Sequence, residues 1–167
     1  MFSTKDGKDH PLKGDHAVKK ASTGEYLLAG RLPEKGAKQH RKIKIPVGAK
    51  VFVPVDNVLC TEKEGDPTPL DTKCAKPDAD GAKDHVSATL NGEPLETSRI
   101  HSHNFKLNIS ELINGTRKNK KGDPLGPTNA SADGYYTTFE LPPFPKGKDY
   151  HELEIKGRDI WLIYQIE

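Results

Sequence analysis

Apolar and polar residues alternate along several short segments of the chain, which is the pattern of half-buried β-strands. In one such segment, Ile43, Ile45 and Val47 share one side of the chain, and Lys42 and Lys44 share the other. No segment shows a convincing 3.6-residue period of an amphipathic helix. The predicted strands are 25–30, 38–47, 50–55, 85–90, 99–109, 135–141, 150–156 and 159–166.

The segment 85–95 is the clearest predicted hairpin. Its first half alternates, and Asn91-Gly92 follows, which is a preferred pair for a two-residue type I′ turn. The alternation places Val86, Ala88 and Leu90 on one face. In the strand that follows, Phe105, Leu107 and Ile109 are predicted to point into the core. His101 and His103 should start on the same side unless a bulge intervenes.

About eight short strands separated by turn residues predict an all-β fold. The expected architecture is a single-domain, jelly-roll-like β-sandwich of short antiparallel strands with long loops. A chain of 167 residues is of the usual size for one domain. Residues 1–15 are rich in Lys, Asp and Gly and are expected to form a flexible N-terminal arm, so the β-sandwich domain should span residues 16–167.

Two long loops are predicted, at 56–84 and 115–132, because these segments have no periodicity. The first holds the chain's only cysteines, Cys60 and Cys74, and no C-x-x-C motif. An isolated pair around a proline-rich loop indicates a disulfide bond, since a zinc site would need further ligands nearby. We therefore expect a Cys60–Cys74 disulfide, formed in an oxidising compartment.

The compartment is otherwise weakly marked in the sequence. No apolar signal-peptide segment follows Met1, so either the protein is cytosolic or the numbering begins after a removed leader. The cysteine pair favours the second alternative, and N-x-[ST] sequons at Asn108, Asn114 and Asn129 are compatible with export. We expect a secreted or cell-surface protein without a membrane span, because no apolar run approaches about 20 residues.

Positive and negative charges are nearly balanced, with 26 Lys and Arg against 24 Asp and Glu. A net charge of +2 gives no reason to expect nucleic-acid binding, which needs a concentrated basic face. The local basic runs Lys38–Lys44 and Arg117–Lys121 are interpreted as the outward face of a strand and as a solvated loop.

Six segments of the chain can be compared with known families: 26–30, 45–55, 57–60, 91–95, 133–136 and 141–147. Taken in this order, they resemble a family of uncharacterised secreted bacterial β-sandwich proteins. Members of that family carry blocks of the IPAGKALFFPV, DGVPL, ADGYW and LPPLSPG types. The resemblance implies an exported β-sandwich and brings no catalytic residue with it; the Trp-rich upstream segment expected of the family is absent here.

Asp78, Asp80 and Asp84 form a D-x-D-G-x-x-D fragment within the first predicted loop. Alternate carboxylates around a glycine turn can converge on a calcium ion, which takes six to eight oxygen ligands. The alternative is a turn with solvated aspartates, because Asp-Gly is common turn chemistry. The full EF-hand pattern with its distal Glu is absent. Calcium is therefore a hypothesis, and no other cofactor is implied.

His101 and His103 lie two residues apart on a predicted strand, so both imidazoles face the same side. Together with His151, they are an alternative metal site for Zn²⁺ or Cu²⁺. The cupin pattern needs a Glu four or five residues after the second His, whereas Glu111 comes eight residues after it. The other interpretation is half-buried histidines that form hydrogen bonds at a sheet edge.

The aromatic residues suggest either a sugar-stacking platform or ordinary core packing, and core packing is favoured for Trp161 and Tyr164. The residues concerned are Tyr135, Tyr136, Phe139, Tyr150, Trp161 and Tyr164.

No nucleophile elbow, zincin motif or phosphate loop is present in the sequence. The expected function is a non-enzymatic extracellular binding or surface-structural module, with a glycan or a cell-surface protein as partner. Homo-oligomer formation stays open. The alternatives are a metal-dependent or carbohydrate-active enzyme and a calcium-stabilised lectin-like domain.

Overall fold

The computed structural model describes residues 18–28, 38–61, 75–102, 104–107 and 128–167. Strands dominate these segments, with one short α-helix and one 3-10 helix, Lys83–His85. The predicted arm, residues 1–15, lies outside the described residues. The remaining elements are β1 Val18–Lys20, β2 Tyr26–Leu28, β3 Lys38–Ile43, β4 Lys50–Thr61, α1 Lys76–Ala82, β5 Ser87–Leu90, β6 Glu93–Pro94, β7 Ser98–His101, β8 Phe105–Leu107, β9 Thr128–Glu140, β10 His151–Lys156 and β11 Trp161–Ile166.

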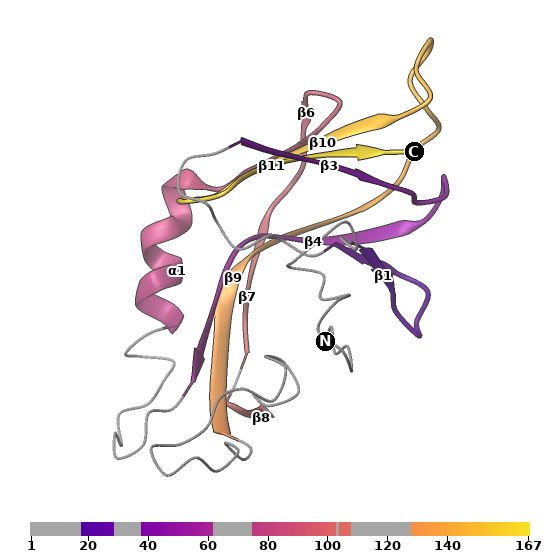
Figure 1. The fold of residues 1–167 in the computed structure, drawn as a ribbon. Helices are drawn as coiled ribbons and strands as arrows, with labels where there is room; N and C mark the ends of the chain where they lie inside the picture. The colour runs from indigo at the N-terminus through magenta and orange to yellow at the C-terminus, as the bar shows by residue number, and fades with distance from the viewer. Residues whose placement is uncertain (1–17, 29–37, 62–74, 103, 108–127) are drawn as a thin grey trace.

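The strands form two mixed sheets, which confirms the all-β prediction (Figure 1). Sheet A has the order β1-β2-β4-β9-β7, with β8 also paired to β9, and sheet B has the order β3-β11-β10-β5-β6. The prediction of purely antiparallel strands is wrong, because β2–β4 and β3–β11 pair in parallel. Parallel neighbours need a crossover connection, and the chain passes through β3 in sheet B between β2 and β4 in sheet A.

One hydrophobic core is built from both sheets. On β4, Val51, Val53 and Val55 alternate inward and are each 1% exposed, and Leu153 and Ile155 do the same on β10. Period-two alternation directs every second side chain to the same face of a sheet. The strands predicted from alternation therefore contribute the centre of the core.

A long antiparallel ladder joins β4 to β9, from Lys50 opposite Glu140 to Thr61 opposite Ala130. Both strands extend into segments that were predicted to be loops, so the loop prediction is wrong for 56–61 and 128–132. A β-bulge interrupts the register between Pro54 and Asp56. An extra residue at a bulge lets two successive side chains face the same side of the sheet, and here both Val55 and Asp56 are buried.

α1 also lies inside the first predicted loop, so that prediction is wrong there as well. Ala75, at the N-cap, and Ala79 and Ala82 are buried at helical spacing, and Figure 1 shows α1 beside the lower part of β4 and β9. Pro77 lies in the first turn, where the missing backbone N–H has no intrahelical partner to lose. The sequence did not predict α1, because three alanines on one face form only a weak apolar pattern and because Pro77 and Gly81 are typical of turns.

The predicted hairpin is confirmed. β5 and β6 pair in antiparallel fashion, and Asn91 and Gly92 have φ values of 55° and 89°. Ala88 and Leu90 are buried, and Val86 packs against the core. The turn residues and the alternation therefore both predicted the observed structure.

The predicted strand 99–109 is two short strands, β7 and β8, both paired with β9. All four residues of β7, an edge strand of sheet A, are exposed. Phe105 is half-buried and is not part of the shared core. The side chain of Leu107 and all of Ile109 lie outside what the structure describes, so their predicted burial stays a prediction.

Val47 was predicted to share the buried side with Ile43 and Ile45, and this is wrong. Val47 is 46% exposed, because β3 ends at Ile43 and the chain turns at Gly48, whose φ is 79°. Within the described segments, no helix is long and apolar enough to cross a membrane.

An alanine substitution at Gly134 tests how closely the bulge region is packed, and the same substitution at Gly81 on α1 is its control. A Cβ on Gly134 would lie 2.6 Å from the Asn57 Cα, so Gly134→Ala should lower the free energy of unfolding by about 1–3 kcal/mol. On α1, a Cβ on Gly81 would meet only the end of Arg158 at 3.4 Å. Gly81→Ala should leave the stability unchanged or raise it by up to about 1 kcal/mol, because alanine favours helix.

Urea denaturation of both variants measures the two effects. Equal destabilisation by the two substitutions would contradict the packing of β9 against the bulge.

Candidate functional site

Asp133 is a buried carboxylate on β9, with a side chain only 1% exposed. Arg99 on β7 donates to it through two nitrogens, Nε to Oδ1 at 2.8 Å and Nη2 to Oδ2 at 2.7 Å. The register places Arg99 opposite Tyr135 and His101 opposite Asp133. Arg99 and Asp133 are therefore diagonal neighbours on the same face of the sheet. Hydrogen bonds from Arg99 hold the pKa of Asp133 below its usual value, as expected for a charge-assisted bidentate pair.

Arg99 also reaches α1, where its Nη1 pairs with Asp80 and its Nη2 donates to the Lys76 carbonyl at 3.3 Å. The hydrogen bonds that the guanidinium donates to Asp133 and then to Asp80 raise the pKa of Arg99. Arg99 therefore ties the helix to sheet A.

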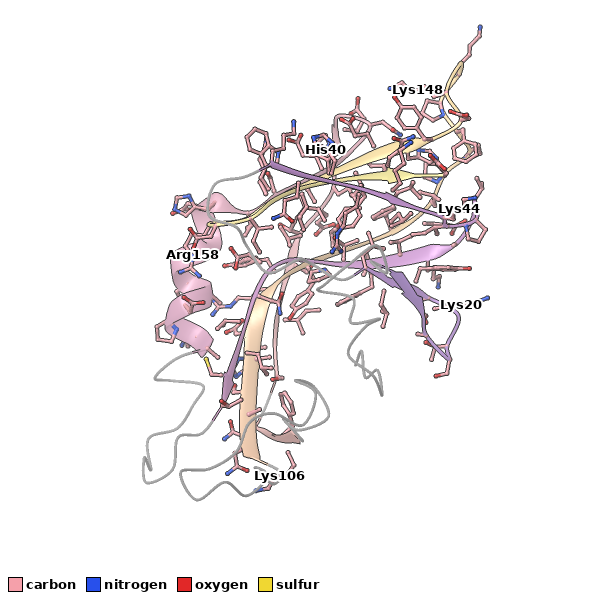
Figure 2. The ribbon with its side chains drawn as sticks, in the orientation of Figure 1. Lys20, His40, Lys44, Lys106, Lys148 and Arg158 are labelled. Carbon is pink, nitrogen blue, oxygen red and sulfur yellow. The ribbon has the colours of Figure 1, made fainter. Side chains whose placement is uncertain are left out.

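A second arginine ties the same helix to sheet B. Arg158, in the turn between β10 and β11, pairs with Asp78 at 2.9 Å, and this hydrogen bond raises the pKa of Arg158. The backbone N–H of Arg158 donates to Asp56 Oδ2 at 2.8 Å. Gly157 permits this approach, because a Cβ there would lie 2.7 Å from the same oxygen. Figure 2 labels Arg158 beside α1.

The calcium hypothesis assumed an acidic loop, and the structure places the fragment on helices instead. Asp78 and Asp80 lie on α1 and pair with two different arginines, whereas Asp84 is exposed in the 3-10 helix. Among the described residues, no group of three or more His, Cys, Asp or Glu side chains is arranged to hold a metal ion.

The two described histidines of the alternative metal site, His101 and His151, lie on different sheets. His101, on the sheet A edge, has its Nδ1 at 3.2 Å from Asp133 Oδ2. His151 is fully buried in sheet B, where Nδ1 accepts from Asn91 Nδ2 and Nε2 donates to the Pro142 carbonyl, both at 2.9 Å. Both nitrogens of His151 are occupied, so its role is structural. His103 lies outside the described residues.

Cys60 is 4% exposed on β4. The described residues include no free cysteine, and the predicted partner Cys74 lies outside them. The Cys60–Cys74 bond therefore stays a prediction.

The aromatic residues divide into buried and exposed ones. Tyr135 and Tyr164 belong to the core, and burial raises the pKa of Tyr164 to about 12. The prediction that Trp161 packs in the core is wrong, since Trp161 is 39% exposed. The alternating pattern of β11 directs Leu162 and Tyr164 inward, and Trp161 therefore faces the solvent on the outer side of sheet B.

Polar side chains hold the indole of Trp161 in place. Lys38 on β3 and Lys156 on β10 lie opposite it in the register, with their Nζ atoms 4.6 and 4.9 Å from the ring centroid. Such cation–π contacts contribute about 0.5–1 kcal/mol each at exposed sites. The indole N–H donates to Glu154 Oε1 at 2.6 Å. This bond lowers the pKa of Glu154, and Lys156 lowers it further.

An open cleft of about 640 Å³ adjoins this indole and is called the Trp161 cleft below. It lies over the turn between β10 and β11 and reaches the 3-10 helix. Its lining combines an aromatic ring with cationic and imidazole groups: His85, Lys156, Gly157, Arg158, Asp159, Ile160 and Trp161.

A second open hollow, of about 650 Å³, lies where β2, β4 and β9 meet in sheet A. Its lining includes the side chains of Leu27, Phe52 and Thr138 and the charged residues Lys50 and Glu140. The ring of Phe52 is already in contact with Tyr136, with 5.2 Å between centroids. This hollow lacks the combination of a solvent-facing indole and several cationic groups that distinguishes the Trp161 cleft.

Comparison of the chain with protein-family models, curated proteins and solved structures finds no match. The resemblance to a secreted family stays a prediction, and the geometry must decide among the candidate sites. Arg99, Asp133 and His151 form hydrogen bonds with partners inside the fold, so these side chains have a structural role. The Trp161 cleft combines an exposed aromatic ring with several charged groups, and is therefore the best candidate for a ligand site.

Asp133→Asn tests the buried pair. The substitution removes the charge that Arg99 faces, so the free energy of unfolding at pH 7 should fall by about 1.5–3 kcal/mol. Because the folded pKa of Asp133 lies below its ordinary value of 3.8, the ionised form favours folding above pH 3.8. That contribution is lost as the pH falls through the folded pKa, and the difference from wild type should shrink there.

Asp80→Asn is the matched control, because Asp80 is 53% exposed on the other side of Arg99. It should cost at most about 1 kcal/mol. Urea denaturation at pH 7 and below pH 3.8 measures both variants, and an Asp133→Asn protein as stable as wild type at pH 7 would contradict the assignment.

Proposed function

We propose that the protein is a non-enzymatic extracellular binding module whose ligand surface is the Trp161 cleft. The proposal includes a jelly-roll-like β-sandwich architecture, which is supported by two sheets that share one core. It also includes a glycan as the class of ligand, because an indole face suits the C–H face of a sugar ring and the neighbouring polar groups suit its hydroxyls.

The observation that carries the proposal is the exposure of Trp161. Tryptophan has the largest apolar surface of any side chain, and it is enriched at the energetic centres of binding sites. Here the ring stands on the outer face of a sheet, held by Lys38, Lys156 and Glu154, beside an open cleft. Such a ring is oriented before a ligand arrives, which reduces the ordering cost of binding.

The enzyme alternative has one specific observation in its favour, the contact of His101 with the buried carboxylate of Asp133. A carboxylate that orients an imidazole occurs in acid–base catalysis and beside catalytic metals. Elemental analysis of the purified protein separates the two functions. A stoichiometric transition metal that is lost in His101→Asn would favour the enzyme.

Export is part of the proposal, and the disulfide is its chemical test. A Cys60–Cys74 bond would close a loop of about 15 residues, worth about 3 kcal/mol in the chain-entropy model. Intact-mass measurement after alkylation should find no adduct in the non-reduced protein and two adducts after reduction. Two adducts without reductant would remove the main argument for an oxidising compartment.

Trp161 is the only tryptophan of the chain, so its fluorescence reports on the proposed site alone. A glycan that binds the cleft should shift the emission, and Trp161→Ala should weaken binding in calorimetry by about tenfold or more. Phe144→Ala is the matched control, because Phe144 is also 39% exposed but lies in the loop between β9 and β10. Loss of binding in Phe144→Ala, with Trp161→Ala unaffected, would place the ligand elsewhere.

A further inference from the structure

The outer face of sheet B carries basic residues along one strand and acidic residues along another. On β3, the outward side chains are Lys38, His40 and Lys42, and Lys44 continues the alternation beyond the strand. These four residues are called the basic column, and His40 and Lys44 are labelled in Figure 2. All four are exposed. Neighbouring members are about 6.6 Å apart along the chain, since a strand rises about 3.3 Å per residue.

The register places Trp161 beside one end of the basic column. Lys38, Trp161 and Lys156 lie opposite one another on β3, β11 and β10. Glu154 and Glu152 follow Lys156 on the outer face of β10 and form the acidic column. The indole therefore stands between the end of a basic column and the start of an acidic one.

The cations on the outer face of sheet B are paired to different degrees. Lys156 Nζ lies 3.2 Å from Glu154 Oε1. Lys42 Nζ has only a loose contact of 3.7 Å with Glu167 Oε1, and the side chains of Lys42 and Glu167 are both exposed. Within the described residues, Lys38 forms no ion pair, and its ammonium faces the indole ring. Lys38 is thus the cation beside Trp161 that is best placed to accept an anionic partner.

We propose that the ligand is an acidic saccharide that extends from the Trp161 cleft across β11 to β3, an inference that rests on the proposed binding function. One sugar ring stacks on Trp161, and the carboxylate or sulfate groups of the saccharide contact Lys38 and the basic column. Lys38 is exposed, and its flexible stem lets the ammonium move from the ring to the anion. The carboxylate of Glu154 keeps acceptor sites for sugar hydroxyls beyond its bond to the indole, because a carboxylate accepts about four hydrogen bonds.

The acidic column argues against a nucleic acid at the same surface. A nucleic acid carries a phosphate at every nucleotide, so a strand bound over Trp161 would bring charges close to Glu154 and Glu152. A saccharide with fewer charges can turn its anionic groups toward β3 and its hydroxyls toward β10. The chain's net charge of +2 also lacks the excess that nucleic-acid binding usually needs.

The basic column has a structural explanation as well. β3 is an edge strand of sheet B, and lysines on edge strands prevent pairing with other chains. This explanation predicts no ligand, so the experiment has to distinguish it from the proposal.

The experiment compares three oligosaccharides of matched length: a uronic-acid oligomer, its carboxyl-reduced neutral counterpart and a sulfated oligomer. An oligothymidylate is measured beside them. Binding is measured by Trp161 fluorescence and by calorimetry, at low salt and at about 0.5 M salt, where charges are strongly screened. At low salt, at least one anionic oligomer should bind about tenfold more tightly than the neutral one, and salt should reduce this preference. The uronate and sulfate arms identify which anion is preferred.

Lys38→Gln should weaken anionic binding about two- to fivefold more than it weakens neutral binding. Lys148→Gln is the control, because Lys148 also lies over an aromatic ring, 5.4 Å from the Tyr150 centroid, in the separate loop shown in Figure 2. It should change neither.

The outcomes separate the two proposals. Equal binding of neutral and anionic oligomers would overturn the acidic ligand and keep the binding module. Binding of none of the three would overturn both, and the basic column would then serve only to protect the edge. Tighter binding of an oligothymidylate than of any saccharide would overturn the acidic saccharide in favour of a nucleic acid.

Discussion

The register of the β4–β9 ladder is the constraint on which the other parts of the structure depend. β2, β7 and β8 all pair with one of these two strands. The bulge at Val55 turns Asp56 inward to meet the Arg158 N–H, and Gly134 leaves room for the backbone of β4 at the same level. A slip of one residue would move every side chain to the opposite face, and both buried aspartates on the ladder would lose their partners.

The acidic fragment on α1 is best understood through this ladder. The helix buries only alanines, so its apolar contact with the sheet is small. Asp78 and Asp80 supplement that contact through Arg158 and Arg99, which come from different sheets. Exposed ion pairs contribute little individually, but Arg99 also serves the buried Asp133, whose charge requires a partner. The helix is therefore attached through residues that the sheets need for their own stability.

The sequence predicted those parts of the fold in which local chemistry and burial agree. The hairpin at Asn91-Gly92 and the alternation of β4, β10 and β11 are of this kind. The ends of β4 and β9 were missed, because Asp56-Asn57 and Asp133-Gly134 are turn-forming pairs that here lie inside a paired strand. Strand direction was missed as well, since a period of two indicates faces and carries no information on parallel or antiparallel pairing.

The candidate site was harder to predict, because its members meet only through register. In β11, Leu162, Ile163 and Tyr164 are all buried, so the segment is apolar on both sides and its pattern does not show that Trp161 is exposed. The interpretation of the basic run 38–44 as the outward face of a strand is right for Lys38, His40 and Lys42 and wrong for Arg41, which is buried on the inner face. Its position beside Trp161 depends on a parallel pairing between strands more than 100 residues apart in the chain, which periodicity does not encode.

The surroundings of Trp161 explain how an exposed indole is tolerated without a ligand and is still ready for one. Two lysine side chains cover part of the ring and a glutamate accepts its N–H, so the polar atom is satisfied and part of the apolar surface is shielded from water. Lysine stems are flexible and their ammonium groups are solvated, so they can leave the ring at a low cost in free energy. The fixed glutamate bond keeps the indole oriented while they do so. The arrangement therefore combines a preoriented aromatic surface with movable cations, which is the combination that an anionic ligand with a flat apolar face requires.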